Sequence, residues 1–254
     1  MFKNAIVRRP AKSMVEGITS NSALGRPEYE KALRQHDDYI SALRTCGLEV
    51  TILDADERYP DACFIEDVAV CTRHHAVVTA PGAATRAGET GGIEEVLKRF
   101  YKQVDRISSP GTLEGGDVMM IRDHFYIGLS ARTKREGANQ LIASLERHGL
   151  TGSVVAMSEM LHLKTGLAYL EDGVLLVAGE FLRCPEFKDF KRVEIDAQES
   201  YAANCIRVND FVLVPAGFPK TARRIADAGM RILEVDTSEY RKLDGGLSCL
   251  SLRF

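Results

Sequence analysis

The sequence lacks the features that mark disordered, membrane-spanning and nucleic-acid-binding proteins. It has no long polar tract, and apolar residues occur throughout, which excludes disorder for most of the chain. No apolar run approaches the roughly 20 residues that cross a bilayer. The 33 basic and 36 acidic residues leave a net charge of −3, whereas phosphate binding is driven by clustered Lys and Arg. We therefore expect neither a membrane nor a nucleic acid as a partner.

The sequence also lacks a recognisable signal peptide and any C-x-x-C pair. Residues 1–7 show no basic leader followed by an apolar core, so we expect a cytoplasmic protein. The six cysteines are then more consistent with free thiols than with three disulfides. Cys63 and Cys71 have no His at zinc-finger spacing, which argues against a structural zinc site. A length of 254 residues suits one large domain or two small ones.

A repeated pattern of apolar strand, tight polar turn and second apolar strand is present. It predicts β-hairpins over residues 66–79, 116–128, 166–177 and 204–215. A fifth copy, residues 246–254, supplies only one strand. Its missing partner is expected to be the first strand, residues 2–7, because pairing of the last strand with the first would close a ring and remove an exposed edge.

Amphipathic helix patterns lie between the hairpins, at residues 27–46, 93–101, 136–148 and 220–228. A short strand is expected after each of them, at 48–53, 104–107, 153–156 and 231–235. The unit of hairpin, helix and strand therefore recurs about five times. Such units arranged around an axis predict a single α/β propeller domain over residues 1–254. An ordinary α/β sandwich with hairpins that only look periodic is the alternative.

A polar residue capable of chemistry precedes each hairpin. Glu66, Glu114 and His162 follow one another at intervals of 48 residues, and Asn204 and Cys249 follow at 42 and 45. In a ring, these positions would face one central cavity and bring together carboxylates, a proton shuttle and a nucleophile. Taken singly, a buried cysteine or a core histidine is an ordinary structural feature. Their shared place in the repeat favours function.

These motifs resemble those of the guanidino-group-modifying enzymes, most closely the dimethylarginine dimethylaminohydrolase family. The similar segments are residues 64–67, 113–117, the region of His162 and residues 244–249, in the right order along the whole chain. The resemblance implies a five-bladed α/β propeller, the pentein fold. It also implies hydrolysis of Nω-methylated arginine to citrulline and dimethylamine or methylamine, with no cofactor.

The resemblance also implies three catalytic roles. Cys249 would attack the guanidinium carbon and form a covalent thiouronium intermediate. His162 would act first as general acid on the leaving amine and then as general base on water. Glu114 would orient His162, as carboxylates do in triads on unrelated folds.

Substrate-binding positions follow from the same resemblance. Carboxylates would orient the guanidinium, and a guanidinium fork suits the substrate carboxylate. Arg86 and Arg132 match positions that bind this carboxylate or fix neighbouring loops, and Asp61 matches the residue that holds the α-amino group. The remaining matched positions are Asp67, Glu66 and Asp244 at the guanidinium, and Ile18 and Leu243, which would offer backbone carbonyls.

The sequence departs from arginine deiminases at one position, because Lys164 stands where they carry the Asp of a His-x-Asp triplet. Loss of an acceptor there favours a methylated substrate, since methylation removes donors. Arginine or agmatine deimination stays the alternative, although agmatine has no carboxylate for the two arginines. A non-catalytic ring protein would need no Cys249, His162 or Glu114. Zinc at Cys249 and His162 would have too few ligands for a dedicated site and would inhibit. A homodimer stays open.

Overall fold

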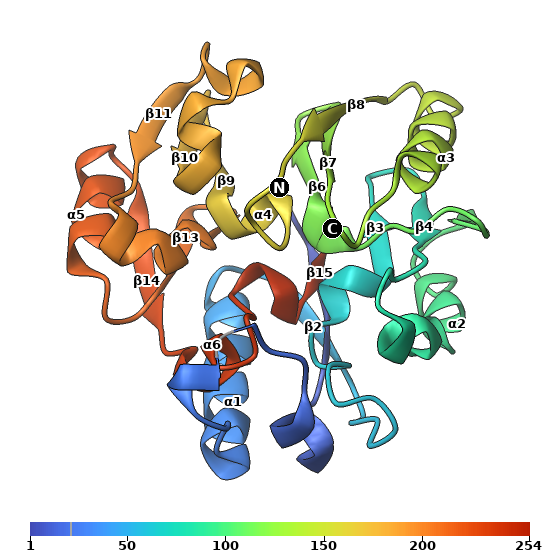
Figure 1. Cartoon of the computed structure of the whole chain (residues 1–254), viewed down its shortest axis with the longest axis horizontal. Helices are drawn as coiled ribbons and strands as arrows, with labels where there is room; N and C mark the ends of the chain where they lie inside the picture. The colour runs from blue at the N-terminus through green and yellow to red at the C-terminus, as the bar shows by residue number, and fades with distance from the viewer. Residues whose placement is uncertain (21) are drawn as a thin grey trace.

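The computed structural model describes residues 1–20 and 22–254, which form five three-stranded sheets around a common centre (Figure 1). Each sheet is one blade of the propeller. The second blade is β3 (Ala69–Cys71), β4 (Ala76–Val78) and β5 (Val104–Arg106), and the third is β6 (Val118–Ile121), β7 (His124–Leu129) and β8 (Thr151–Ala156). The fourth is β9 (Leu167–Glu171), β10 (Val174–Val177) and β11 (Lys191–Glu194), and the fifth is β12 (Ile206–Val208), β13 (Phe211–Pro215) and β14 (Arg231–Val235). The middle strand of each sheet is antiparallel to the first strand and parallel to the third.

The first blade joins the two ends of the chain. β15 (Leu252–Arg253) pairs antiparallel with β1 (Asn4–Arg8), and β1 runs parallel to β2 (Glu49–Leu53). The backbone N–H of Lys3 donates to the carbonyl of Phe254 at 2.9 Å. The predicted closure of the ring by its terminal strands is therefore confirmed, and so is the predicted five-bladed propeller.

A parallel connection needs a crossover, and helices provide it in four blades. They are α1 (Tyr29–Thr45), α2 (Ile93–Leu97), α3 (Arg135–Glu146) and α5 (Pro219–Asp227). The helix predicted at residues 93–101 ends earlier than expected. The fourth blade has two 3-10 turns instead, Gly179–Arg183 and Pro185–Phe187, because extended backbone at Cys184 before Pro185 interrupts the helix. Among the described residues, no helix is both long and apolar enough to cross a membrane.

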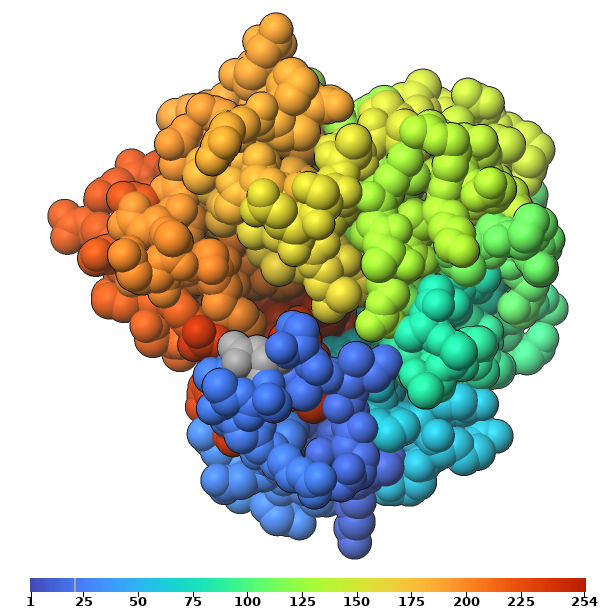
Figure 2. All heavy atoms as spheres, in the orientation of Figure 1, coloured from blue at the N-terminus to red at the C-terminus, as the bar shows by residue number. Residues whose placement is uncertain are grey.

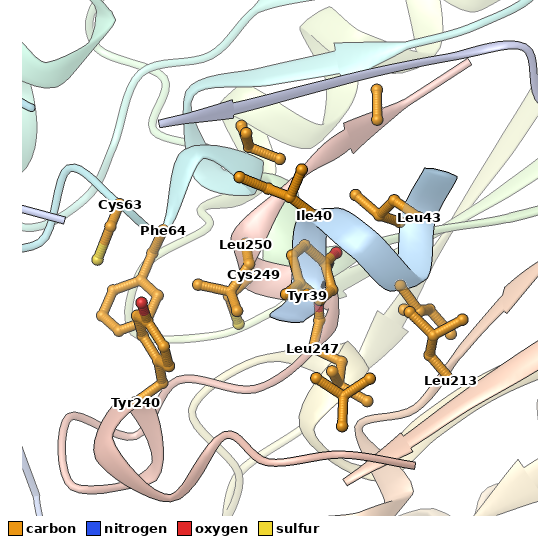
Figure 3. Close-up of a cluster of buried hydrophobic side chains, with 14 of the residues drawn as sticks. Tyr39, Ile40, Leu43, Cys63, Phe64, Leu213, Tyr240, Leu247, Cys249 and Leu250 are labelled. Carbon is orange, nitrogen blue, oxygen red and sulfur yellow. Dashed lines mark hydrogen bonds between the residues drawn. The ribbon is translucent and has the colours of Figure 1, made fainter. Parts of the chain in front are cut away.

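Apolar side chains pack between neighbouring blades. In the cluster of Figure 3, Tyr39 and Leu43 of α1 meet Leu213 of β13 and Leu247 near the C-terminus, so the first and fifth blades share a core. Cys249 lies in the same cluster. Burial of this kind contributes about 25 cal/mol per Å² of apolar surface. The nucleophile expected from the sequence is thus held by packing between two blades.

A short helical turn precedes the first strand of every blade. These turns are Ile65–Val68, Gly115–Asp117, α4 (Leu163–Gly166), Ala197–Ala203 and Ser248–Leu250. The hairpin strand expected from residue 66 accordingly begins only at Ala69, because 3-10 bonds such as Asp67 N–H to the Phe64 carbonyl come first. Several of the turns contact one another near the ring axis. The helical turns, and not the strands, therefore hold the residues that recur before each hairpin, namely Glu66, Glu114, His162, Asn204 and Cys249.

Candidate active site

Three of the helical turns lie at a pocket of about 140 Å³, which is lined by Asp67 of the turn Ile65–Val68, His162 at the N-cap of α4 and Cys249 of the turn Ser248–Leu250. The space-filling view shows a hollow at the centre of one face, where N-terminal, middle and C-terminal segments meet (Figure 2). The pocket brings together most of the residues expected from the sequence, namely Ile18, Asp61, Asp67, Arg86, Arg132, His162, Leu243, Asp244 and Cys249. Glu114 lies directly behind His162, whereas Glu66 lines a different cavity.

His162 and Glu114 form a buried pair. His162 stands at the N-cap of α4, and its Nε2 lies 2.7 Å from Oε2 of Glu114, which has no exposed surface. The other carboxylate oxygen accepts the backbone N–H of Gly82 at 2.9 Å. Burial by itself lowers the pKa of His162, but Asp67 and then the Glu114 hydrogen bond raise it to about 9. His162 is therefore an imidazolium at neutral pH and can donate a proton.

Cys249 is a protonated thiol at neutral pH. Its Sγ accepts the backbone N–H of Gly246 at 3.4 Å and lies 3.9 Å from Oγ of Ser248. Burial raises the pKa of the Cys249 thiol to about 12, and the negative charges of Glu66 and Asp67 add to the effect. A positive charge entering the pocket would oppose both causes.

Arg86 is held entirely by the protein. Its Nη1 donates to Asp67 at 2.7 Å, its Nε donates to Glu89 at 3.0 Å, and its Nη2 donates to Glu89 and to the Phe64 carbonyl. All three nitrogens therefore have partners, and the geometry favours the loop-fixing role expected for Arg86 over direct binding of a carboxylate. Burial would raise the pKa of Asp67, but His162 and Arg86 lower it to about 2.

Arg132 differs from Arg86. Its guanidinium pairs with Glu114 at the longer distance of 3.5 Å, and 18% of its side chain is exposed. It lines the pocket on the side of the His162–Glu114 pair. A carboxylate that enters the pocket can therefore reach donors of Arg132 more readily than donors of Arg86.

Two carboxylates tie the N-terminal loop to the rim of the pocket. Asp61 accepts the backbone N–H of Ile18 at 3.1 Å, and Asp244 accepts the backbone N–H of Ser20. Burial raises the pKa of Asp61, and Arg86 opposes this. Both carboxylates line the pocket, so they can also face a bound cation.

Glu66 points away from the pocket that sequence reasoning assigned to it. It lines a cavity of about 490 Å³ together with Lys164 and Arg253. Its Oε1 accepts Lys164 Nζ at 2.6 Å and Arg253 Nη2 at 3.1 Å, and its Oε2 accepts the Ser248 hydroxyl at 2.8 Å. Its carboxylate therefore lies with Lys164 and Arg253 at the larger cavity, on the other side of the turn that carries Cys249. The structure therefore does not place Glu66 where it could orient a guanidinium in the pocket.

Sequence reasoning also missed the partners of Ser248. Asn204 makes two hydrogen bonds with it, through Oδ1 at 2.9 Å and Nδ2 at 3.2 Å. The repeat had singled out Asn204 as the position equivalent to the catalytic residues, but the pattern alone gave it no role. The departure at Lys164 was likewise visible in the sequence, although its pairing with Glu66 was not.

Among the residues that the structure describes, two groups of side chains have ligand atoms within 4.8 Å of one another, as a metal site would require. The first is Asp67, Glu114 and His162, where the imidazolium proton occupies the place of a cation. The second is His75, Asp105 and His148, between the second and third blades. In this second group the imidazole rings of His75 and His148 stack with centroids 3.9 Å apart, and Ser144 and Arg147 both donate hydrogen bonds to Asp105. These internal bonds compete with a metal ion in both groups.

Comparison with known proteins decides the family. The model of the family described as N,N dimethylarginine dimethylhydrolase, eukaryotic, matches residues 21–206. A dimethylarginine dimethylaminohydrolase of Pseudomonas aeruginosa is 60% identical over the full length of both chains. The chain belongs to the dimethylarginine dimethylaminohydrolase family. A second member, from Streptomyces coelicolor, is 37% identical, with coverage of 99% of this chain and 96% of the other.

Solved structures agree with this assignment. The C249S variant of the Pseudomonas aeruginosa family member, complexed with citrulline, matches with a TM-score of 0.98 at 60% identity over all of both chains. An H162G dimethylarginine dimethylaminohydrolase, as its adduct with S-methyl-L-thiocitrulline, matches equally well. The N-terminal domain of ArgZ, a cyanobacterial arginine dihydrolase, has a TM-score of 0.87 at 18% identity, covering 100% of this chain and 97% of that one. At that identity the likeness shows the fold alone.

Proposed function

We propose that the protein hydrolyses Nω-methylated arginines to citrulline and dimethylamine or methylamine, with residues 1–254 as one catalytic domain. The observation that carries the proposal is a buried thiol and a protonated imidazole in one pocket lined by carboxylates, in a member of this family. The pocket has a cation-binding side, with Asp67, and a carboxylate-binding side, with Arg132. Asp61 and the backbone carbonyls of Ile18 and Leu243 suit an α-amino group between them, and Asp244 adds negative charge at the rim.

The substrate's own charge activates the nucleophile. A guanidinium about 4 Å from the sulfur contributes roughly 4 kcal/mol at an effective dielectric constant of about 20, which lowers the thiol pKa by about 3 units. The pKa of Cys249, about 12 without substrate, would then approach that of His162. Binding and activation of the nucleophile are therefore one event.

The reaction then proceeds in two halves. The Cys249 thiol first loses its proton to solvent as the substrate cation binds. The Sγ thiolate then attacks the guanidinium carbon, the protonated His162 gives its proton to the methylated nitrogen, and the C–N bond breaks to leave a thiouronium and the free amine. Neutral His162 next takes a proton from water, whose oxygen attacks the same carbon. The C–S bond breaks and restores the thiolate, the protonated ureido group loses its extra proton to solvent, and citrulline leaves. Glu114 holds the ring throughout, and both steps use side chains alone, so we propose that no cofactor takes part.

The alternative is deimination of arginine or agmatine. Agmatine would leave Arg132 without a carboxylate to bind. For arginine, Lys164 supplies no acceptor, because a lysine ammonium only donates hydrogen bonds, and here it donates to Glu66 in the other cavity. Both points favour the methylated substrate, as does the family.

One assay tests the proposal. The protein is incubated with asymmetric dimethylarginine, monomethylarginine, arginine and agmatine, and ureido product is measured from each. We expect product from the methylated arginines and a loss of kcat of at least about 10³-fold in Cys249→Ser. Cys184→Ser, at a partly exposed thiol outside the pocket, is the control and should keep its activity. Turnover of arginine alone would overturn the substrate assignment, and full activity of Cys249→Ser would overturn the mechanism.

A further inference from the structure

Asn204 occupies the fourth of the five repeat positions, yet it has no part in the reaction described above. It ends the turn Ala197–Ala203, is 8% exposed and does not line the pocket. Its Oδ1 accepts the backbone N–H of Ser248 at 2.9 Å, and its Nδ2 donates to the Ser248 hydroxyl oxygen at 3.2 Å. Ser248 directly precedes Cys249. The side chain of Asn204 therefore fixes the residue next to the nucleophile at both its backbone and its side chain.

The same carboxamide contacts the other end of the turn that bears the nucleophile. A Cβ atom on Gly246 would lie 2.5 Å from Cγ of Asn204, so only a glycine lets the two groups approach this closely. Gly246 N–H donates to Cys249 Sγ at 3.4 Å, and Cys249 N–H donates to the Gly246 carbonyl at 3.2 Å. Asn204 thus contacts both Gly246 and Ser248, on either side of this turn.

The hydroxyl of Ser248 is oriented by the same contacts. Its single proton goes to Oε2 of Glu66 at 2.8 Å, and its oxygen accepts Nδ2 of Asn204. Lys164 and Arg253 hold the other oxygen of Glu66. The turn therefore rests on a fixed polar layer between the pocket and the larger cavity. With the Ser248 proton committed to Glu66, Gly246 N–H is the donor directed at the sulfur.

We propose that Asn204 is a positioning residue for Cys249: its carboxamide fixes residues 246–249 so that the Gly246 N–H stays directed at Sγ. A hydrogen bond to the charged form favours that form, so this donor helps the thiolate to form when a cationic substrate enters. The inference rests on the proposed function, because it takes Cys249 as the nucleophile. It also gives a role to the polar side chain at a repeat position that does not line the pocket.

The test compares Asn204→Ala with Asn209→Ala. Asn209 bonds the backbone of Phe2 and Cys46 through its own carboxamide and has no hydrogen bond to the turn 246–249. Alkylation of Cys249 by iodoacetamide at pH 8–9.5 is followed by peptide mass spectrometry, and kcat and KM are measured with dimethylarginine. In Asn204→Ala we expect alkylation to slow about 3- to 10-fold, as for a thiol pKa raised by about one unit. The kcat should fall about 10- to 100-fold with KM within about twofold.

The control variant Asn209→Ala should lose stability but keep the wild-type alkylation rate and the wild-type kcat and KM. Alkylation and kcat at wild-type values in Asn204→Ala would overturn the inference, and so would a raised KM with unchanged kcat, since that result assigns Asn204 to substrate binding. If Asn204→Ala does not fold, the isosteric Asn204→Asp keeps the acceptor, loses the donor and adds negative charge. It should slow alkylation likewise, and an unchanged rate would overturn the inference. A wild-type protein inert toward methylated arginines would sink the proposed function, while alkylation would still decide the role of Asn204.

Discussion

Replacement of Glu114 by glutamine should lower the pKa of His162 while keeping the shape of the site. The carboxylate faces His162 Nε2 at 2.7 Å and Gly82 N–H at 2.9 Å. In the variant, the amide oxygen would stay on the Gly82 N–H, and the amide nitrogen would face the imidazole. An N–H donor favours the neutral ring, whereas the present carboxylate favours the imidazolium. Loss of charge and reversal of the hydrogen bond therefore act in the same direction.

The expected size follows from the energy of a charged hydrogen bond. About 1.5–3 kcal/mol corresponds to about 1–2 pKa units, which would take the pKa of His162 from about 9 to roughly 7–8. The imidazolium donates the proton in the first half of the reaction. It would then be mostly absent from the variant at pH 9 but largely present at pH 7. The variant's deficit in kcat/KM should be about tenfold larger at pH 9 than at pH 7.

The assay is the pH profile of kcat/KM for dimethylarginine from pH 6 to 10, together with an NMR titration of His162. Glu239→Gln is the control, because Glu239 is also buried but pairs with Lys31 and Lys242 outside the pocket. That variant should lose stability without moving the basic limb of the profile. If the basic limb and the titration of His162 stay in place in Glu114→Gln, the pair does not set the pKa and the reasoning is refuted.

Four further changes have distinct expected outcomes. Arg86→Ala removes the cation that pairs with the buried carboxylates of Asp67 and Glu89, and it should lower the free energy of urea unfolding by about 3–5 kcal/mol. Arg132→Ala should cost little stability and should raise KM for dimethylarginine at least about tenfold. Burial lowers the pKa of His36 to about 4, so the unfolded chain protonates first as pH falls from about 6.5. Between pH 7 and 4.5 the wild type should lose about 2–3 kcal/mol more stability than His36→Leu, measured by urea unfolding. Zinc binding at Cys249 and His162 must displace protons, so inhibition should strengthen from pH 6 to pH 9 and be reversed by EDTA.

Local patterns in the sequence were enough to predict the blades. Alternating and continuous apolar runs with polar turns located the hairpins, and helical periodicity located α1, α3 and α5 within a few residues. Closure by residues 2–7 and 246–254 followed because a strand without a partner leaves an exposed edge. These features depend on neighbouring residues in the chain, which is why one sequence suffices to find them.

The helical turns before the inner strands escaped prediction because four of them have only three or four residues, too few to show periodicity, and the seven-residue turn Ala197–Ala203 is kinked at Glu199. The turn Gly115–Asp117 is an example: two glycines and an aspartate have low intrinsic helix propensity. The fourth blade differed for another reason. Gly179 has a φ of +58°, and Pro185 forces extended backbone on the residue before it, so two separate 3-10 turns replace a helix there.

The direction of Glu66 could not be predicted because distant residues decide it. Its partners Lys164 and Ser248 lie 98 and 182 residues away in the sequence. The resemblance placed Glu66 beside Asp67 at the guanidinium, but adjacent residues of a helical turn project in different directions, about 100° apart around an α-helix. Asp67 faces the pocket, whereas Glu66 lies beneath it and pairs with Lys164 and Arg253. The sequence motif therefore predicted which residues lie near the site better than it predicted where their side chains point.

The two carboxylates nevertheless act together on the chemistry. Beyond the effect of burial, Glu66 and then Asp67 raise the pKa of Cys249, and Asp67 also raises the pKa of His162. His162 and Cys249 are thus both protonated at neutral pH, while Asp67 is ionised: the acid is ready, and the nucleophile is held back. A site with an unscreened thiolate would react with any electrophile that entered. Here the same negative charges that suppress the thiolate attract the one class of ligand, a guanidinium cation, whose arrival reverses the suppression. Selectivity and activation then have a common electrostatic origin, which a neutral analogue of the substrate could not reproduce.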